Sequence, residues 1–425
     1  MKSSLSFAKA WFAVSLLVLA FGYGFASHAW GLFPKGFVER AWQQFYWQVQ
    51  QQEGPTTFTG TPRYDRQGVQ IPRPEEMQPG LTLISSSWKG PDGWDPELRL
   101  IDKNGKVLHK WRIDREELFQ EGITQRIDES GVHGTYLLSG GHIVANLEYV
   151  GMVRLDACSD VMWTLGEGNH HSIDQAEDGS FWTPVVTSTP KNKSKNYPDG
   201  YPGIEKKIWV DGVINVDKSG SIVDKKNILD LLYKSEILYK MRETLYNHSG
   251  KDITHMNDVG ALSSDMSDEY PLFDSGDLLV SLLGMNLVFV FDPDSGEVKW
   301  HETDYISMQH DPDFVGDGWI SVFDNGAKWA DGSRVVMFKT SRDSVKVRRF
   351  SKLDFYTSVQ GKHQSLNNGN VLLTETKKGR VIEVDSRGDV VWEWIHQPID
   401  SSRIPSVTKA TRVDLTRQGY RICEE

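Results

Sequence analysis

The sequence has 425 residues, of which 39% are hydrophobic and 25% are charged, as is typical of a globular rather than a disordered protein. The formal net charge is −11 and no run of Lys and Arg stands out, which argues against a nucleic-acid partner, because phosphate contacts need clustered positive charge. The 15 Trp and 38 Gly favour short strands joined by tight turns.

The N-terminus predicts one membrane-spanning helix. No charged residue occurs from Trp11 to Phe33, and such a run is long enough to cross a bilayer. Lys2 and Lys9 precede it, so we expect the N-terminus to stay in the cytoplasm and the rest of the chain to lie on the periplasmic or extracytoplasmic side. Cleavage near Ser27–Ala29 is the alternative, but the run is long for a cleaved signal. Residues 1–34 are therefore interpreted as an uncleaved single-pass anchor.

Residues 35–79 are expected to connect this anchor to a folded domain. The stretch FVERAWQQFYWQVQQQ (37–52) predicts an amphipathic helix beside the membrane, and residues 53–80 predict a linker rich in Pro, Gly, Thr and Arg.

The chain has only two cysteines, Cys158 and Cys423. They form either one disulfide bond or two unpaired thiols, and their separation in sequence does not decide between these alternatives.

One pattern repeats from residue 80 onward. Each unit has an alternating strand, an Asp, a short turn that usually ends in Gly, and a second alternating strand, which is the pattern of a β-hairpin. The units are LRLIDKNGKVLHKW (98–111), VRLDACSDVMW (153–163), VINVDKSGSIV (213–223), VFVFDPDSGEVKW (288–300), VIEVDSRGDVVWEW (381–394) and a degenerate copy, VKVRRFSKLDF (345–355).

Another strand precedes most of these hairpins, so the sequence predicts six four-stranded units. We therefore expect an all-β fold, a six-bladed β-propeller over residues 80–425, with one N-terminal transmembrane helix. Two stacked β-sandwiches are the alternative, but they do not explain the shared registers. Residues 224–248 carry apolar residues near helical spacing and predict a helical insertion on one face of the propeller.

Histidines recur just before predicted inner strands. The inner strands of a propeller surround a central channel and run in the same direction, so these side chains are expected to form a partial ring at one channel mouth. A neutral imidazole can act there as nucleophile, general acid, general base or metal ligand. A structural consensus residue of the repeat is the alternative, and a metal site is disfavoured because no short metal motif occurs. The five are His133, His171, His255, His310 and His363, with His170 expected as a neighbour of the ring.

Four ordered motifs resemble the bacterial arylsulfotransferase family, which uses aryl sulfates as donors. They are NHHSID (169–174), ITHMNDVGAL (253–262), MQHDPDF (308–314) followed by ISVFDNG (320–326), and GKHQSLNNGNVLLTE (361–375). The likeness extends from about Gly80 to VTKATRVD (407–414).

This resemblance implies a ping-pong reaction through a sulfohistidine, with an aryl sulfate and a phenol as partners and with no cofactor and no metal. His310 matches the family's nucleophile, and His171 and His255 match its supporting histidines. Asn325 is expected to orient His310 or to donate a hydrogen bond to the substrate, with a turn-forming role as the alternative. His363 is expected at the edge of the substrate site.

One position departs from the family pattern. Leu283, in VSLLGMN (280–286), stands where the family has an Arg, and losing one charged donor in a buried site costs about 2–4 kcal/mol of transition-state stabilisation. Lys328 or Arg334 could supply another cation. Besides sulfuryl transfer, two alternatives stay open: a non-catalytic binding propeller in envelope or polysaccharide assembly, and a metal-dependent hydrolase or lyase. The sequence leaves the oligomeric state undetermined.

Overall fold

The computed structural model describes residues 2–30, 58–90, 93–119, 131–235, 237, 239, 251–326, 332–341 and 344–414. The chain divides into two units, which we describe separately. One comprises Met1–Pro55 and Tyr246–Ser249, and the other comprises Thr56–Leu245 and Gly250–Glu425. The predicted amphipathic helix at 37–52 lies outside the described residues.

The first unit contains one long helix, α1 (Lys2–Trp30). Within it, Lys9–Ala26 is long and apolar enough to cross a membrane, and large apolar side chains such as Phe21 and Leu17 are exposed. Its length and composition fit a membrane anchor and also a signal sequence.

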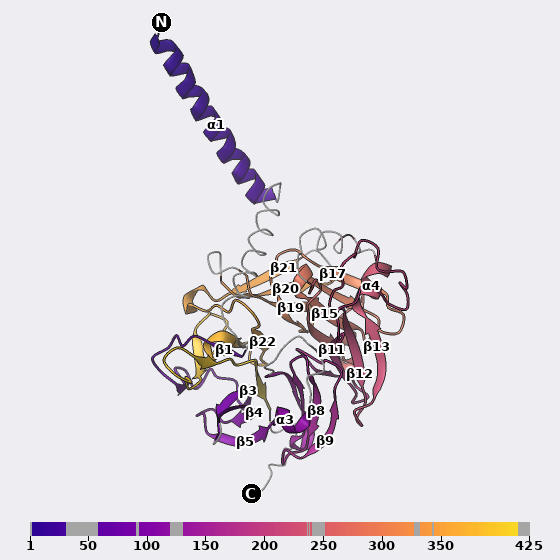
Figure 1. Cartoon of the computed structure of the whole chain (residues 1–425). Helices are drawn as coiled ribbons and strands as arrows, with labels where there is room; N and C mark the ends of the chain where they lie inside the picture. The colour runs from indigo at the N-terminus through magenta and orange to yellow at the C-terminus, as the bar shows by residue number, and fades with distance from the viewer. Residues whose placement is uncertain are drawn as a thin grey trace. The chain divides into compact units, whose positions relative to one another are not determined.

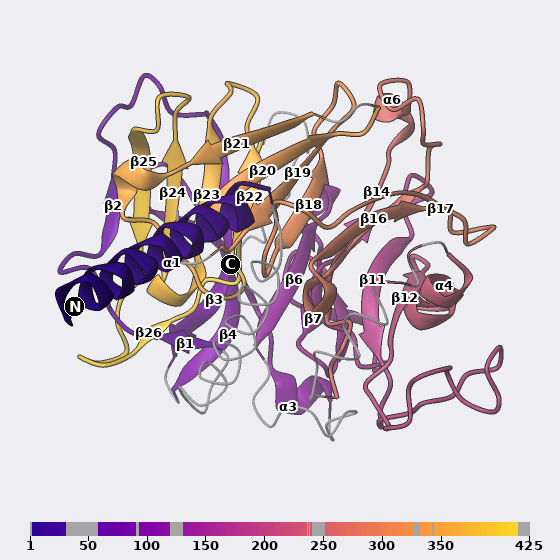
Figure 2. The ribbon, with the colours of Figure 1, turned by 90° about the horizontal axis from the view of Figure 1, so that it is seen from above.

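The second unit is a six-bladed β-propeller, as predicted (Figures 1 and 2). Its blades are antiparallel sheets whose strands follow the chain from the channel outward, and the colour in Figure 2 changes from purple to yellow as the chain passes from blade to blade. The first three blades are β27 (Lys409–Val413), β3 (Leu81–Lys89), β4 (Trp94–Ile101) and β5 (Val107–Arg112); β6 (Val132–Leu137), β7 (Ile143–Leu147), β8 (Gly151–Leu155) and β9 (Val161–Leu165); and β10 (Asp174–Gln175), β11 (Phe181–Val186), β12 (Asp211–Val216) and β13 (Ile222–Asn227). The next three are β14 (Met256–Ala261), β15 (Leu278–Leu282), β16 (Leu287–Phe291) and β17 (Val298–Glu302); β18 (His310–Phe314), β19 (Trp319–Asp324), β20 (Arg334–Lys339) and β21 (Val345–Arg349); and β22 (Lys362–Ser365), β23 (Val371–Glu375), β24 (Arg380–Val384), β25 (Val390–Ile395) and β2 (Gly68–Gln70).

The two ends of the propeller chain are fixed by pairing with distant strands. β27 is the innermost strand of the first blade, where Lys409 pairs with Ser85 in β3. β2 adds a fifth strand to the sixth blade by pairing with β25, and β1 (Thr59–Gly60) pairs with β26 (Ile404–Pro405). Part of the stretch that the sequence predicted to be a linker therefore forms strands.

Apolar side chains fill the spaces between neighbouring blades. The hairpin tryptophans contribute to these layers, since Trp111 and Trp394 are buried and Trp163 and Trp300 pack half-buried against apolar clusters. Each fully buried large apolar side chain stabilises the fold by about 1.5–3 kcal/mol, so the inter-blade layers hold the inner strands, and the side chains on them, in place.

Two predicted local structures are wrong in detail. The degenerate copy at 345–355 is not a hairpin: β21 ends at Arg349 and a 3-10 turn, η3 (Ser351–Leu353), follows, because Phe350 and Phe355 turn into an apolar cluster. The helical insertion begins later than expected, because residues 222–227 pair with β12 as β13.

Short helices complete the fold. The helix of the insertion, α4 (Ile228–Lys234), starts where the side chain of Asn227 accepts a hydrogen bond from the backbone N–H of Asp230, and it buries Leu229 and Leu232. Most of the predicted insertion beyond Ser235 lies outside the described residues. The other short elements are α3 (Arg115–Leu118), α6 (Ser264–Ser267), η1 (Ser139–Gly141), η2 (Leu283–Met285) and η4 (Thr376–Lys378).

Candidate functional site

Histidines from four blades gather at the start of the inner strands. His133 is the second residue of β6, His171 precedes β10, His255 precedes β14, and His310 opens β18. The ring centroids of His133 and His171 are 4.3 Å apart, and those of His171 and His255 are 5.4 Å apart. Charge on His133 or His255 lowers the pKa of His310, so all four imidazoles share one electrostatic environment. We call His133, His170, His171, His255 and His310 the histidine cluster.

The cluster histidines do not hold one equivalent position in their blades. His171 and His255 both adopt left-handed backbone conformations, with φ of 52° and 46°, and an Asp follows each of them three residues later. In the fifth blade the corresponding left-handed residue is Met308, with φ of 58°, so His310 lies two residues further along its strand. A non-glycine residue in this conformation is uncommon, and its recurrence marks a shared bend at the channel mouth.

His310 has a fixed orientation and a fixed tautomer. Its Nδ1 lies 2.7 Å from Asn325 Oδ1 and 3.0 Å from the carbonyl oxygen of Met308. The amide orientation of Asn325 follows from its network, because its Nδ2 donates to the carbonyl oxygens of Thr357 at 2.9 Å and Gln360 at 2.7 Å. Both partners of His310 Nδ1 are therefore acceptors, so Nδ1 carries the proton and Nε2 of the neutral ring carries a lone pair.

His310 is also held in the neutral state. Burial lowers its pKa to about 3, outweighing the hydrogen bond to Asn325, which raises it, and the charge of Lys362 lowers it further. A neutral imidazole with an available lone pair is the form that acts as a nucleophile.

Glu148 links two of the other imidazoles. It follows β7, and one carboxylate oxygen lies 2.7 Å from His133 Nδ1 and accepts the backbone N–H of His171 at 3.1 Å. Its other oxygen lies 3.2 Å from His171 Nδ1. Burial raises the pKa of Glu148, but the charge and hydrogen bond of His133 oppose this and bring the value to about 2. The pKa of His171 lies well below its usual value because of burial and because of the neighbouring imidazoles.

His170 lies next to His171 in the histidine cluster, and a place beside the ring was expected for it. Its Nδ1 lies 2.9 Å from His171 Nδ1, and its ring packs on Tyr149 with centroids 4.9 Å apart. On the opposite side of the cluster, the Nδ1 of His255 is hydrogen-bonded to the carboxylate of Asp252.

Asp174, Asp258 and Asp311 each lie three residues after the left-handed residue of their blade. We call these side chains the carboxylate layer. Lys362 Nζ contacts the carboxylate of Asp258 and lies 2.9 Å from Asp311 Oδ1, so one buried cation links the fourth, fifth and sixth blades. Burial lowers the pKa of Lys362, but the two carboxylates outweigh it and hold the value above the usual range. Lys362 was not predicted from the sequence, in which its only signal is a Lys immediately before His363.

His363 belongs to this carboxylate layer rather than to the histidine cluster. Its backbone N–H donates to Asp311 Oδ2 at 2.6 Å, and its Nε2 lies 2.7 Å from Ser321 Oγ. Burial lowers the pKa of His363, but the hydrogen bond and charge of Asp311 raise it overall.

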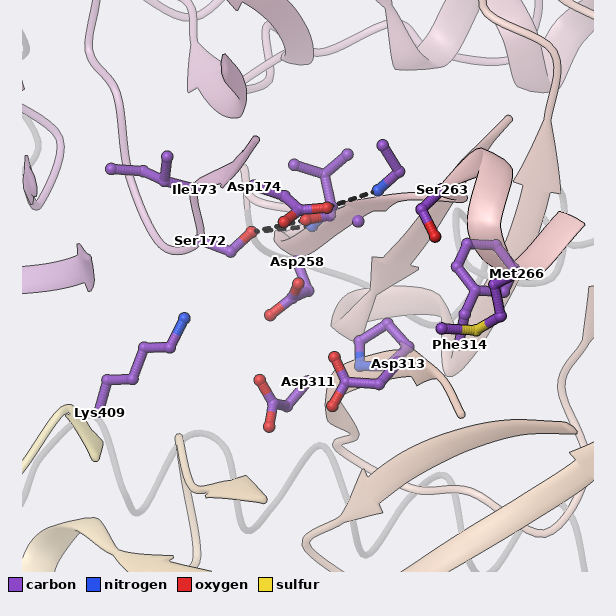
Figure 3. A pocket seen from close by; sticks show the side chains of 14 residues that line it. Ser172, Ile173, Asp174, Asp258, Ser263, Met266, Asp311, Asp313, Phe314 and Lys409 are labelled. Atoms are coloured by element: carbon purple, nitrogen blue, oxygen red, sulfur yellow. Dashed lines mark hydrogen bonds between the residues drawn. The ribbon is translucent and has the colours of Figure 1, made fainter. Parts of the chain in front are cut away.

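A cavity of about 180 Å³ opens beyond the carboxylate layer, between β10, β14 and β18. Figure 3 shows the carboxylates of Asp258, Asp311 and Asp313 facing one another, with Lys409 approaching from the first blade. Burial raises the pKa of Asp174 in the same wall to about 6. Apolar side chains such as Phe314 and Met266 line the rest of the cavity.

Of the two cations proposed to replace the family Arg, only Arg334 lies among the described residues. Leu283 is buried, and its backbone N–H donates to the carbonyl oxygen of His255 at 3.1 Å. Arg334 donates to Asp324 Oδ2 at 2.7 Å and to the carbonyl oxygen of Tyr305 at 2.9 Å, so its guanidinium is engaged there. Lys328 and Cys423 lie outside the described residues, so the roles predicted for them stay predictions.

Among the residues that the structure describes, two groups of side chains could hold a metal ion. One is His133, Glu148 and His171, and the other is Asp311, Asp313 and His363. The ammonium of Lys362 beside Asp311 opposes a cation in the second group. Nitrogen and carboxylate ligands in the first group would suit zinc.

The fold and the site define a six-bladed propeller whose channel gathers imidazoles around an oriented neutral histidine. The family described as Arylsulfotransferase (ASST) matches residues 134–397, which is more than half of the chain. The chain belongs to the arylsulfotransferase family and is an enzyme of the sulfotransferase class.

No curated protein matches the chain. Among solved structures, a protein of unknown function from Bacteroides caccae has 12% identity and a TM-score of 0.48 over 75% of this chain and 94% of its own. A catalytically inactive virginiamycin B lyase from Staphylococcus aureus with quinupristin has 10% identity and a TM-score of 0.41 over 79% and 90%. The Dos1 propeller has 11% identity and a TM-score of 0.40 over 79% and 77%. These likenesses carry no functional argument.

Proposed function

We propose that this enzyme moves a sulfuryl group from an aryl sulfate to a phenol through a sulfohistidine at His310. The observation that carries the proposal is the hydrogen bond from His310 Nδ1 to Asn325, which leaves the lone pair of Nε2 available on a ring that stays neutral.

In the first half-reaction, His310 Nε2 attacks the sulfur of the donor. The N–S bond forms, the bond from sulfur to the aryl oxygen breaks, and the phenol leaves with a proton. In the second half-reaction the oxygen of a new phenol attacks the same sulfur, the N–S bond breaks, and the lone pair returns to Nε2. The acceptor's proton goes to the base that protonated the leaving group, so the enzyme is unchanged after one cycle.

His255 is the residue that we assign to this proton transfer. Its Nδ1 is hydrogen-bonded to the carboxylate of Asp252, which orients the ring, and we assign Nε2 to exchange a proton with the phenol oxygen. Its side chain is 16% exposed, so a phenol can approach it. His171, between His133 and His255, would pack against the sulfuryl group and help to exclude water.

We assign one further substrate contact, at His363, and an orienting role to Asn325. Asn325 acts on the substrate only through His310, because its amide is fully used by His310, Thr357 and Gln360. His363 is hydrogen-bonded to Asp311 of the carboxylate layer and does not belong to the histidine cluster. Its proposed contact is therefore with the part of the substrate that reaches the carboxylate layer.

The N-terminal helix gives the proposed location. We propose that residues 1–34 anchor the enzyme in the membrane, that residues 35–79 connect it, and that the propeller domain, residues 80–425, faces the periplasm or cell exterior. Lys9–Ala26 supports this because it is long and apolar enough to cross a membrane, and Lys2 and Lys9 favour a cytoplasmic N-terminus.

The test is phenol-dependent release of nitrophenol from nitrophenyl sulfate, combined with mass spectrometry of the quenched enzyme. His310→Ala should abolish both turnover and the sulfuryl adduct, whereas His301→Ala, which alters an exposed histidine of β17, should retain both.

Leu283 is the observation that favours a second candidate, a propeller that binds its ligand without reacting. A buried apolar side chain next to His255 supplies no charge for a sulfate group. A folded wild-type protein that forms no adduct with any aryl sulfate would support this alternative.

A further inference from the structure

We propose that His133 is a further catalytic residue, which donates a hydrogen bond from Nε2–H to a sulfuryl oxygen, and that Glu148 is its positioning residue. This inference rests on the proposed sulfuryl transfer at His310 and names the group that stabilises the charge on the transferred oxygens.

The position of His133 supports this role. It is buried in β6 and its ring lies against His171. Burial is the main cause of the low pKa of His171 and of His310, and His133 lowers both pKa values further. His133 is therefore part of the same electrostatic environment as the proposed nucleophile, although it comes from a blade three places earlier in the chain.

The hydrogen bonding of His133 is incomplete in a way that calls for a ligand. Glu148 is a carboxylate and can only accept, so His133 Nδ1 carries a proton. The other ring nitrogen, Nε2, is buried and has no hydrogen-bond partner among the described residues. Leaving a buried polar atom without a partner is costly, and such atoms in native structures commonly await a ligand or water.

The charges of the site point to the kind of ligand. His310 and His171 are neutral at pH 7, because burial holds the pKa of each well below its usual value. Lys362 is already shared by two carboxylates. His133 differs from these groups because one ring nitrogen is hydrogen-bonded to a carboxylate and the other has no hydrogen-bond partner among the described residues.

An anion at Nε2 would complete this arrangement. In the proposed complex both ring nitrogens of His133 carry a proton: Nδ1–H donates to Glu148 and Nε2–H donates to a sulfuryl oxygen. No covalent bond forms at His133, and it keeps both protons during the transfer. The groups in contact with this ring are Glu148 and His171, and His310 lies within electrostatic range of it.

The experiment uses the full chain and measures the first half-reaction without acceptor. Wild type, His133→Gln, Glu148→Gln and the surface control His301→Gln are mixed with 4-nitrophenyl sulfate or with phenyl sulfate, and the adduct on His310 is followed by mass spectrometry. Losing one donor to a developing oxyanion reduces the rate by roughly 100- to 1,000-fold. We expect His133→Gln to show this loss by the same factor for both donors, with a smaller change in donor affinity, and Glu148→Gln to lose rate in the same direction.

Three results would overturn the assignment while leaving the proposed function intact. The first is a folded His133→Gln protein that forms the adduct as fast as wild type. The second is a rate loss much larger for phenyl sulfate than for nitrophenyl sulfate, which would make His133 an acid for the leaving group. The third is stoichiometric zinc whose removal by a chelator stops adduct formation. If His133→Gln does not fold, Glu148→Gln, which keeps the side-chain volume, decides by the same rate. A wild-type enzyme that forms no adduct on His310 would instead overturn the proposed function and this inference with it.

Discussion

Replacing Asn325 by Ala should slow the chemistry in a protein that still folds. The substitution removes the acceptor at 2.7 Å from His310 Nδ1 but leaves the carbonyl oxygen of Met308 at 3.0 Å, so the tautomer is retained while the ring loses one of its two anchors. A misplacement of about 1 Å at a reacting atom can cost roughly 100-fold in rate. We therefore expect adduct formation on His310 to slow by about 100-fold.

The expected loss of stability is small for a buried amide. Asn325 Nδ2 donates to the carbonyl oxygens of Thr357 and Gln360. The carbonyl oxygen of Thr357 also accepts a hydrogen bond from Ser333 Oγ at 3.1 Å, so only the carbonyl oxygen of Gln360 loses this donor without another side-chain donor beside it. Leaving one buried acceptor without a partner costs about 1–3 kcal/mol, to be measured by urea unfolding.

Asn370→Ala is the matched control for this experiment. Asn370 is a buried amide in the sixth blade whose Nδ2 donates to the carbonyl oxygen of Glu76 at 2.8 Å and to Glu383 Oε1 at 2.7 Å. It should lose comparable stability and keep the wild-type rate of adduct formation. An Asn325→Ala protein that is folded and reacts as fast as Asn370→Ala would refute the claim that Asn325 orients the nucleophile.

Three further predictions concern charge and location. The folded pKa of His310 is about 3 and the unfolded value is near 6.5, so the unfolded chain binds more protons between these values and stability falls on acidification. Between pH 6.5 and pH 5 the free energy of urea unfolding of wild type should fall by about 2 kcal/mol more than that of His310→Gln. Equal losses would contradict the burial argument. Lys362→Met leaves Asp258 and Asp311 without their shared cation and should cost about 3–5 kcal/mol at pH 8 and less at pH 5, where the carboxylates can take up protons; thermal melts at both pH values check this, and a loss that does not depend on pH would be inconsistent with it. Deleting residues 1–57, and with them Lys9–Ala26, should move the enzyme from the membrane to the soluble fraction, whereas a full-length chain that is already soluble would rule out the anchor.

The repeating pattern of the sequence was sufficient to predict the propeller. Alternating strands around an Asp turn are local signals, and hairpins such as β4–β5 and β24–β25 formed where the pattern placed them. The entry of β27 into the first blade is not local, because nothing in the sequence of Lys409–Val413 identifies β3 as its neighbour.

In the candidate site, too, local features could be predicted from the sequence and non-local ones could not. A His before an inner strand is visible in the sequence, so His171, His255 and His310 could be expected at one channel mouth. Their different registers could not be predicted, because they depend on which residue takes the left-handed conformation, His255 in one blade and Met308 in another.

Side chains that act through a distant partner were also missed. Glu148 follows a strand of the second blade and gains its meaning from His133 and His171, which lie 15 and 23 residues away. Lys362 likewise depends on carboxylates from two other blades. Residue type and spacing carry no information about such contacts. The contacts form only when the blades of the propeller come together.

The most direct test of the account is mass spectrometry of wild-type enzyme quenched after mixing with an aryl sulfate in the absence of phenol. The account predicts one sulfuryl group on His310, formed as nitrophenol is released and lost when phenol is added. A folded enzyme that turns over the donor while carrying the group on another residue, or on none, would contradict it.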